Sequence, residues 1–316
     1  MLRRTRIAGG VRRLAAVAWL LALVGCRGKA APPASVGTLH VTDDAGRVVH
    51  VRAPVRRVLS LLPSLTETLV ALGAAETLVG RTRYDTLQAL RRLPDVGGGL
   101  DPSVETVLAL RPQVVLGFAS PHSPHASLAE VLARYGVPTL LFAIQDTADV
   151  FRSIAVIGRL VGRENEARAL ARRLRAAFDS VRRVVAERPR PRVAYLSGGT
   201  PPYTASNTTF LGQLLELAGG RNVFPVLERP WAPVSLEEVV RRRPEVLVLP
   251  TGSGVPDLAS LRRAPGWRDL PAVRTGRVVW IDADLLHRPG PNLPRVAWAL
   301  ARALHPEATA SAPAGR

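Results

Sequence analysis

Cysteine, lysine and aromatic residues are scarce in this sequence of 316 residues, and each scarcity narrows the class of protein. The single cysteine, Cys26, excludes a disulfide-stapled fold and any zinc site made of clustered cysteines. Acidic residues are also few, 25 against 43 Lys and Arg, so the formal net charge is +18. A hydrophobic content of 47% argues against disorder, and the length suits one large domain or two lobes.

The strongly basic charge raises the possibility of nucleic-acid binding. Apart from Lys29, every cationic residue is an arginine, and the arginines are spread along the chain instead of gathering in one arm. The sequence has no zinc finger, no RNP-like aromatic motif and no basic zipper. We therefore expect no nucleic-acid partner and interpret the arginines as solvated surface.

The N-terminal segment has the features of an export signal. Residues 1–13 contain five arginines and no acid, and residues 14–24 form an unbroken apolar run. Because about 20 helical residues are needed to span a bilayer core, this shorter run is typical of a secretory signal. It ends in Leu-Val-Gly-Cys, which resembles the bacterial lipobox, whose cysteine receives a diacylglycerol.

These features predict a lipoprotein signal peptide over residues 1–25 and lipidation of Cys26. Export by the Sec or the twin-arginine route stays open. Loss of the signal removes five arginines and leaves a net charge of +13. The small, Pro-rich residues that follow predict a flexible tether over 26–37. We expect an extracytoplasmic protein anchored by lipid to the cell envelope.

Short apolar runs alternate with helical segments in the rest of the chain, which predicts an α/β fold with parallel sheets. The runs 39–42 and 48–51 flank Asp-Asp-Ala-Gly and predict a hairpin. A helix is predicted over 63–72, with Ser64 as its N-cap, Glu67 three residues on and Gly73 at its end. The other predicted strands are residues 57–61, 114–118, 139–142, 193–196, 246–249 and 278–281.

An internal repeat indicates two similar lobes. Residues 103–116 read SVETVLALRPQVVL and residues 235–248 read SLEEVVRRRPEVLV, with Ser, Glu, Val, Arg, Pro and Val in register. Each copy predicts a short helix that is capped by serine, ends at Arg-Pro and continues into an apolar strand.

Between the copies, residues 146–188 are predicted to form one long backbone helix. Apolar residues recur at intervals of three and four, while arginines occupy the other faces. The predicted boundaries are an N-terminal lobe at 38–145, a C-terminal lobe at 189–308 and a disordered tail at 309–316. A stiff amphipathic helix of this length would connect the lobes and limit the closure of the cleft between them. The apolar positions of its second half are Ala167, Leu170, Leu174, Phe178, Val181 and Val185.

Several segments resemble the solute-binding proteins of ABC importers for vitamin B12, haem and iron-siderophores. They are RRVLSLLPSLTETLVALGAAETLVGRTRYDT, DVGGGLDPSVETVLALRPQVVLGF, PPYTASNTTFLGQLLELAGGRNVF and RPWAPVSLEEVV. The resemblance extends from Thr38 to about His305 and is greatest to cobalamin binders. It implies two Rossmann-like lobes joined by a helical backbone, the class III periplasmic binding protein fold.

The same resemblance implies that Glu105 and Glu237 dock into arginine pockets on the two permease subunits. One acid on each lobe suits a twofold transporter, and Arg–carboxylate pairs fix the geometry. The alternative is that both are N3 residues of capping boxes, bonded to the caps of their own helices.

The resemblance also implies ligand contacts from loops that face the cleft. The matching residues are Tyr84, Phe118, Tyr203, Trp231, Asp284 and Arg288. Aromatics with a few polar anchors suit a large corrinoid or porphyrin ring, whose faces are mostly apolar. One departure from the cobalamin binders lies at 97–99, where this chain has three glycines and some relatives carry another aromatic.

Histidines offer the only weak metal candidates. His122 and His125 follow the predicted strand 114–118, and His287 lies beside Arg288. A pair separated by a proline is poor bidentate geometry, so we interpret both as solvent-exposed loop residues and expect no metal site. No nucleophile elbow or complete phosphate-binding loop is present, and we expect no enzymatic activity.

The leading hypothesis is a monomeric, lipid-anchored receptor that captures a corrinoid and delivers it to an ABC permease dimer with its ATPase. It needs no intrinsic cofactor, because its ligand is the metal chelate itself. A haem or iron-siderophore receptor of the same fold is the first alternative. A surface sensor or adhesion lipoprotein without a transport role is the second.

Overall fold

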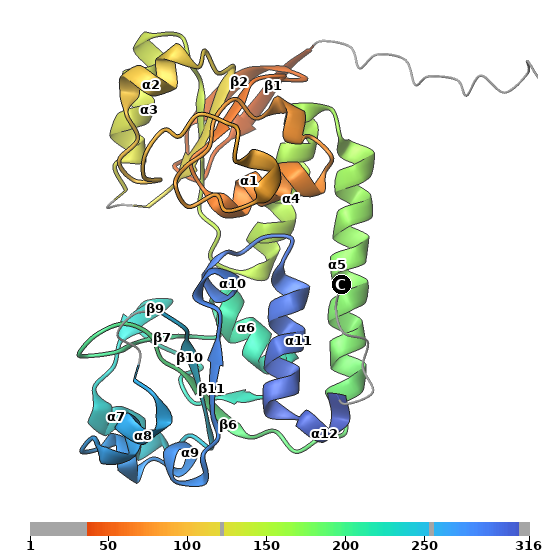
Figure 1. Ribbon diagram of the computed structural model, residues 1–316. Coiled ribbons are helices and arrows are strands. Elements are labelled where there is room, and N and C mark those ends of the chain that lie inside the picture. Colours follow the sequence, from red (N-terminus) through yellow and green to blue (C-terminus); the bar gives the residue numbers. More distant parts are fainter. Residues whose placement is uncertain (1–36, 121–122, 253–255, 310–316) are drawn as a thin grey trace, which may run out of the picture. The chain divides into compact units, whose positions relative to one another are not determined.

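The computed structural model describes residues 37–120, 123–252 and 256–309 (Figure 1). The predicted signal peptide, most of the tether, Cys26 and His122 lie outside these residues. The described chain begins with an antiparallel hairpin of β1 (Gly37–Thr42) and β2 (Val48–Ala53), which confirms the predicted hairpin. Val41 and Val51 face the core, while the alternate residues face solvent.

The N-terminal lobe contains a parallel sheet in the order β3-β4-β5. Its strands are β3 (Val58–Ser60), β4 (Val114–Phe118) and β5 (Thr139–Phe142). In β3 and β4, alternate residues enter two different cores, Val58, Val114 and Leu116 one of them and Leu59 and Val115 the other, as expected for a sheet covered on both faces. The helices of this lobe are α1 (Pro63–Ala71), η1 (Ala75–Thr77), η2 (Gln88–Leu90), α2 (Val104–Ala109) and α3 (His125–Arg134).

The start of α1 differs from the prediction. The N-cap is Leu62 and not Ser64, and no side chain caps the helix. Pro63 occupies the first helical turn, where its missing N–H and fixed φ are well tolerated. The helix therefore begins before Ser64, which is buried within it.

The C-terminal lobe contains a second parallel sheet in the order β11-β10-β6-β8. A separate antiparallel ribbon pairs β7 (Tyr203–Ala205) with β9 (Trp231–Pro233). The sheet strands are β6 (Arg192–Tyr195), β8 (Arg221–Asn222), β10 (Val246–Pro250) and β11 (Val278–Ile281). The helices are α6 (Phe210–Leu217), α7 (Leu236–Arg242), α8 (Leu258–Arg263), η3 (Trp267–Asp269), α9 (Pro271–Thr275), α10 (Ala283–His287), α11 (Leu293–Leu304) and α12 (Pro306–Thr309).

The segment predicted as one backbone helix, 146–188, is two helices. The first, α4 (Thr147–Val161), ends at Gly162, whose φ of 69° is left-handed. The second, α5 (Glu164–Val185), then runs back along the first, and a Cβ on Gly158 would come within 2.6 Å of the Cβ of Ala167. Glycines therefore both break the helix and permit the close packing of its two halves.

The long green helix of Figure 1, α5, connects the two lobes. It packs against α4, which contacts α1 and β2 of the N-terminal lobe, and against α6, α11 and α12 of the C-terminal lobe. All six apolar positions predicted to face the core of α5, from Ala167 to Val185, are buried. The amphipathic periodicity was therefore predicted correctly, although the uninterrupted length was not.

Candidate functional site

A cavity of about 460 Å³ lies between the two lobes. Residues that follow the carboxyl ends of parallel strands line it from both sheets, where α/β folds commonly bind ligands. The N-terminal lobe contributes Leu62, Pro63, Ser64, Phe118 and Ile144; the C-terminal lobe contributes Tyr195, Ser197, Tyr203, Phe210, Trp231, His287, Arg288 and Pro289.

Aromatic rings form the C-terminal wall of this cavity. The ring of Trp231 lies 6.1 Å from that of Tyr195 and 5.8 Å from that of Phe210, centroid to centroid. The first pair is T-shaped, with an angle of 83° between the planes. Such edge-to-face contacts hold the rings in fixed orientations, so the wall is an ordered apolar surface.

The ribbon β7–β9 positions two of the aromatic residues. Ala205 pairs with Trp231 and Tyr203 pairs with Pro233 across its antiparallel register. Trp231 is half-buried at the start of β9, while Tyr203 remains 50% exposed at the rim. The ribbon therefore presents one anchored ring inside the cavity and one accessible ring at its mouth.

The buried Tyr195 and the more exposed His287 form a polar pair in the same wall. A hydrogen bond of 2.5 Å joins the Tyr195 hydroxyl and Nε2 of His287. Burial raises the pKa of Tyr195 to about 12, although a hydrogen bond with Ser197 opposes this shift. Burial also lowers the pKa of His287, against the opposing charge of Asp284. Both groups are therefore neutral at neutral pH.

Arg288 is the cation of the cavity and also links the two lobes. Its side chain is only 12% exposed and lies 3.3 Å from Glu67 of α1 and 2.6 Å from Asp284 of α10. Burial raises the pKa of Glu67, while the charge and hydrogen bond of Arg288 oppose the rise. The interaction with Glu67 therefore ties the loop after α10 to the N-terminal lobe.

The structure brings four of the six residues predicted as ligand contacts to this cavity. They are Phe118, Tyr203, Trp231 and Arg288. Asp284 does not line it, and its largely exposed carboxylate contacts the lining residue Arg288. Tyr84 is 55% exposed and does not line it either. The roles of all six residues in ligand binding stay predictions.

Sequence reasoning missed three ring-bearing lining residues and one charged partner. Tyr195 is the last residue of β6, and Phe210 is the first residue of α6. From the sequence, His287 is a weak candidate for a metal ligand, and Glu67 belongs to the predicted start of a helix. The position of Tyr195 at a strand end was a usable signal, whereas the pairing of Glu67 with Arg288 had no local signal.

His125 has a structural role, which corrects its interpretation as an exposed loop residue. It is fully buried, its Nδ1 accepts a hydrogen bond from the Phe118 N–H at 2.6 Å, and its Nε2 lies 2.5 Å from the Gly99 carbonyl oxygen. Burial lowers its pKa, so the ring is neutral and both nitrogens are used within the protein. Among the described residues, no group of three or more His, Cys, Asp or Glu is arranged to hold a metal ion.

The two predicted docking glutamates occupy equivalent positions in the two lobes. Ser103 and Ser235 cap α2 and α7, and each hydroxyl accepts from the N–H three residues on. Glu105 and Glu237 are thus at the second helical position and not at N3, which rules out the capping-box alternative as it was framed.

Both carboxylates are exposed and directed to their own caps. Ser103 Oγ donates to Glu105 at 3.1 Å. Hydrogen bonds from its own backbone N–H and from the Ser235 hydroxyl lower the pKa of Glu237. Within the part of the chain that the structure describes, neither Glu105 nor Glu237 forms an ion pair. Their charges are therefore available to a partner.

A larger cavity of about 890 Å³ lies along α5 and α6, and its chemistry is different. Two of its arginines pair with acids of the same lining, Arg182 with Asp179 at 2.8 Å and Arg190 with Glu216, while the guanidinium of Arg175 lies 4.4 Å from the centre of the Phe151 ring. Because this lining is rich in charged groups, the smaller interlobe cavity is the better candidate for a ligand with apolar faces.

Two α/β lobes, a connecting helix and an aromatic cavity between the lobes define a solute-binding receptor of the class III type. The chain matches the Periplasmic binding protein family over residues 58–285. It therefore belongs to this family of substrate-binding transport proteins. Among the described residues, no helix combines the length and the apolar character that crossing a membrane would need.

Two relatives of this chain have names that agree with this family. Over 284 residues, the chain is 27% identical to the "Uncharacterized ABC transporter substrate-binding lipoprotein YvrC" of Bacillus subtilis, with 88% of this chain and 89% of the relative covered. It is 28% identical over 241 residues to a "Vitamin B12-binding protein" of Photorhabdus laumondii, covering 75% and 83%.

A solved structure is similar to a comparable degree. The periplasmic heme-binding protein BhuT, in complex with two hemes, aligns with a TM-score of 0.69 at 31% identity. The alignment covers 78% of this chain and 97% of that one. The expected family and fold class are confirmed, and the relatives differ in the ligand that their names give.

Proposed function

We propose that this protein is the lipid-anchored receptor of an ABC importer and captures a corrinoid between its lobes. The observation that carries the proposal is the interlobe wall of Tyr195, Phe210 and Trp231 around a single buried cation, Arg288. Ring faces would bury apolar area against these aromatics, and Arg288 would orient a polar side group.

The space beside this wall supports a large ligand. A second cavity of about 570 Å³ shares Phe118, Ile144 and Trp231 with the first, so the two adjoin. Together they offer apolar surface on both sides of Trp231. A vitamin B12-binding relative at 28% identity favours the corrinoid as the occupant.

Haem is the second candidate. Tyr195, Tyr203 and His287 line the cavity, and tyrosine and histidine both ligate haem iron. The similarity to a heme-binding structure at 31% identity also favours it. A corrinoid carries its own axial ligands more often than haem does, so the two ligands make different demands on these side chains.

Delivery to the permease would use Glu105 and Glu237, the two exposed and unpaired acids of the repeated helix. The membrane anchor would be a diacylglycerol on Cys26, as the name of the lipoprotein relative suggests. Mass spectrometry of the mature N-terminus tests this anchor, and an unmodified Cys26 would contradict it.

Calorimetry with cyanocobalamin, haemin and a ferric siderophore panel tests the ligand. We expect saturable 1:1 heat with cyanocobalamin and none with the siderophores. Heat with haemin alone would replace the corrinoid by haem, and no heat with any of these ligands would contradict both proposals. Binding without uptake in a strain that carries the permease and ATPase would indicate a sensor.

A further inference from the structure

The hairpin β1–β2 places two histidines opposite each other on its solvent face. Its register pairs Leu39 with Val51 and Val41 with Val49 on the inner face, and His40 with His50 on the outer face. Because side chains alternate along a strand, burial of the valines forces both imidazoles outward. Two of the six histidines of the sequence therefore meet on one exposed surface.

The two imidazoles are already at chelating distance. Their Nδ1 atoms lie 2.7 Å apart, and their ring centroids are 4.5 Å apart with an angle of 86° between the planes. Two nitrogens bound to one cation at about 2.0–2.1 Å and at a right angle are separated by about 2.9 Å. A tetrahedral angle would require about 3.3 Å. The two Nδ1 atoms therefore need to move only slightly further apart to bind an ion that prefers its ligands at right angles.

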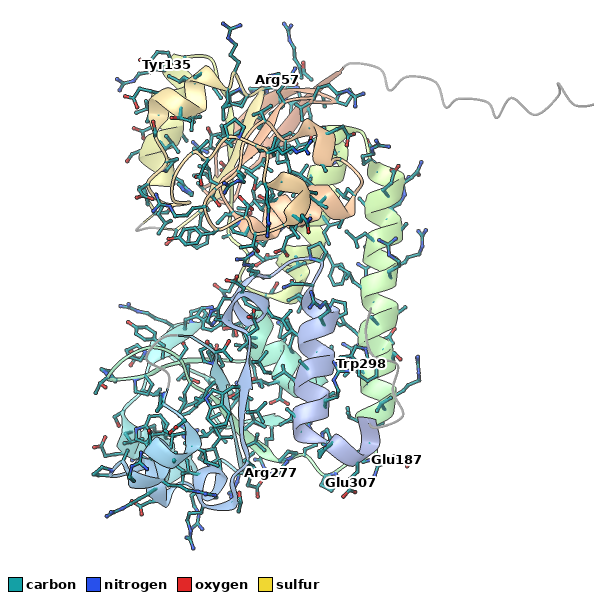
Figure 2. The ribbon with its side chains drawn as sticks, in the orientation of Figure 1. Arg57, Tyr135, Glu187, Arg277, Trp298 and Glu307 are labelled. Atoms are coloured by element: carbon teal, nitrogen blue, oxygen red, sulfur yellow. The ribbon has the colours of Figure 1, made fainter. Side chains whose placement is uncertain are left out.

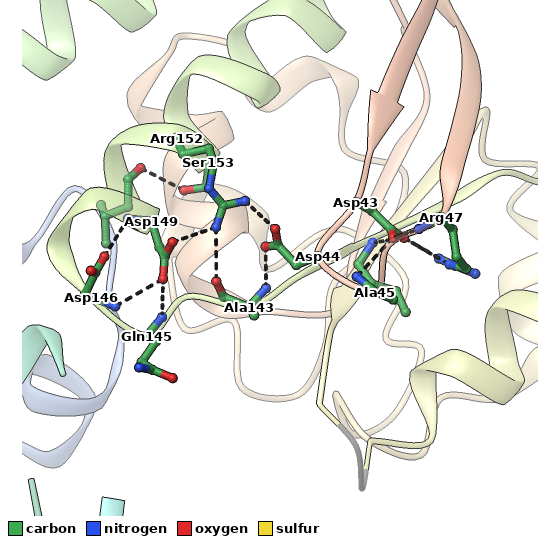
Figure 3. Close-up of polar contacts among 12 residues, drawn as sticks. Asp43, Asp44, Ala45, Arg47, Ala143, Gln145, Asp146, Asp149, Arg152 and Ser153 are labelled. Atoms are coloured by element: carbon green, nitrogen blue, oxygen red, sulfur yellow. Dashed lines mark hydrogen bonds and ion pairs between the residues drawn. The ribbon is translucent and has the colours of Figure 1, made fainter. Parts of the chain in front are cut away.

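The hairpin is fixed to the lobe on either side of its turn (Figure 3). Asp43 accepts from the Leu141 N–H and pairs with Arg47, which donates to the Thr139 carbonyl. Asp44 accepts from the Ala143 N–H and pairs with Arg152 of α4. The β1–β2 pairing sets the histidine pair, and the turn that joins the two strands is held by contacts to β5 and α4 before any ion binds.

The imidazole rings themselves can still adjust. Both are exposed, and the χ2 torsion of histidine is broad, so a modest rotation directs both lone pairs toward one point in solvent. In the metal-free pair, one Nδ1–H donates to the other Nδ1. To bind the ion, the donor ring takes the Nε2–H tautomer by proton exchange with water, so that both Nδ1 lone pairs are free and the neutral pair loses no net proton.

We propose that His40 and His50 form a binding site for a divalent transition-metal ion, Cu²⁺ or Ni²⁺, supplied as the aqueous ion. Imidazole favours these ions over Ca²⁺ and Mg²⁺, which require oxygen ligands. The neighbours on the same face are Thr38, Thr42, Val48 and Arg52, and none supplies a carboxylate. Water fills the rest of the coordination sphere, and right-angle geometry favours Ni²⁺ over Zn²⁺.

This site is separate from the interlobe cavity. Neither histidine lines that cavity, whose proposed occupant is a metal already enclosed in an organic ring. A failure of the chelate proposal would therefore leave the hairpin site unaffected, and the reverse also holds. The protein would therefore bind transition metals in two independent ways, as a chelate in the interlobe cavity and as an aqueous ion at the hairpin.

Titration of the full chain without an affinity tag tests the site, with NiCl₂, CuCl₂ and ZnCl₂ in a buffer free of chelators. We expect one Ni²⁺ per chain, a rise in the unfolding temperature at saturation, and tighter binding of Ni²⁺ than of Zn²⁺. Paramagnetic broadening in NMR spectra should start at the ring protons of His40 and His50.

Threonine keeps strand propensity, so His40→Thr and His50→Thr preserve the fold while removing one ligand each. Both variants should lose Ni²⁺ binding and the thermal shift, whereas Arg52→Thr on the same face should keep them. Calorimetry with cyanocobalamin should be unchanged in all three. Wild-type Ni²⁺ affinity in either histidine variant, or no 1:1 binding in the unaltered chain, would overturn the proposal.

Discussion

The two lobes carry the same helix-to-strand unit but line the cavity with different chemistry. In the N-terminal lobe the cap Ser103 precedes α2, and a left-handed Arg111 with a φ of 45° follows the helix. In the C-terminal lobe the cap Ser235 precedes α7, and a left-handed Arg243 with a φ of 48° follows it. The cavity, in contrast, receives one aromatic ring from the first lobe, Phe118, and most of its rings from the second. Symmetry is therefore retained where a twofold partner would bind, and lost where an asymmetric ligand would bind.

The largest effect is expected from removing the symmetric acids together. Glu105→Ala with Glu237→Ala should abolish uptake while leaving ligand affinity unchanged, because both carboxylates lie outside the cavity. Each single variant should weaken docking and lower uptake, because each removes one partner of a charge pair. Uptake of radiolabelled ligand, measured beside calorimetry, checks this.

The neighbouring acid Glu238 provides the matched control. It pairs with Arg241 and Arg242 of its own helix, so Glu238→Ala should leave uptake near the wild-type rate. Strongly unequal effects of the two single docking variants would show that the two lobes do not dock equivalently. Normal uptake in the double variant would refute docking by these two glutamates.

Because the C-terminal lobe supplies most of the rings that line the cavity, we expect the aromatic residues of the two lobes to contribute unequally to ligand affinity. Trp231→Ala should weaken ligand binding about 30-fold, or ~2 kcal/mol, since it removes the central ring of the C-terminal wall. Phe118→Ala should cost about 1 kcal/mol, because Phe118 is the single aromatic residue among those that line the cavity from the N-terminal lobe. Calorimetry with cyanocobalamin, or with haemin if haemin alone binds, measures both losses of affinity.

A tryptophan outside the cavity serves as the control. Trp298 lies on α11 and packs against the main core (Figure 2). Its replacement by alanine should lower the unfolding temperature without changing ligand affinity. If Phe118→Ala weakened binding more than Trp231→Ala, the C-terminal lobe would not be the dominant wall.

Local patterns in the sequence predicted the repeating parts of this fold well. The strands β4, β5 and β11 coincide with the predicted runs, because continuous apolar segments between turn signals have few other solutions. The buried face of α5 was predicted for the same reason, since a spacing of three and four residues defines one side of a helix.

Contacts between distant segments could not be predicted in this way. Arg288 and Glu67 are 221 positions apart in the sequence. The buried contact between Nε2 of His125 and the Gly99 carbonyl oxygen joins residues 26 positions apart. The break at Gly162 was also missed, because glycine is tolerated within helices and only the packing of α4 on α5 decides for a turn. Site residues at strand ends were therefore easier to predict than the partners that hold them.

Burial of the Glu67 carboxyl group predicts a pH-dependent stability. Burial holds the pKa of Glu67 above its ordinary value of 4.5, so the folded state binds the proton more tightly than the unfolded state. The free energy of unfolding should therefore fall as pH rises from about 4.5 through the raised pKa. Glu67→Gln should flatten this part of the curve, as measured by urea unfolding at several pH values.

The exposed glutamate of α3, Glu130, gives a control for this measurement. Glu130→Gln should retain the wild-type pH dependence. A slope that survives in Glu67→Gln would assign the proton uptake to another group and would contradict the raised pKa of Glu67.

The smallest expected effect tests whether the two repeats are energetically equivalent. Ser103→Ala and Ser235→Ala each remove a side-chain cap and should each lower the free energy of unfolding by about 1 kcal/mol. Each change also removes the hydroxyl that contacts Glu105 or Glu237, so the carboxylate should become more mobile without a large loss of docking. Chemical unfolding of the two variants in parallel measures the costs. Costs that differ by more than about 1 kcal/mol would show that similar caps support the two lobes unequally.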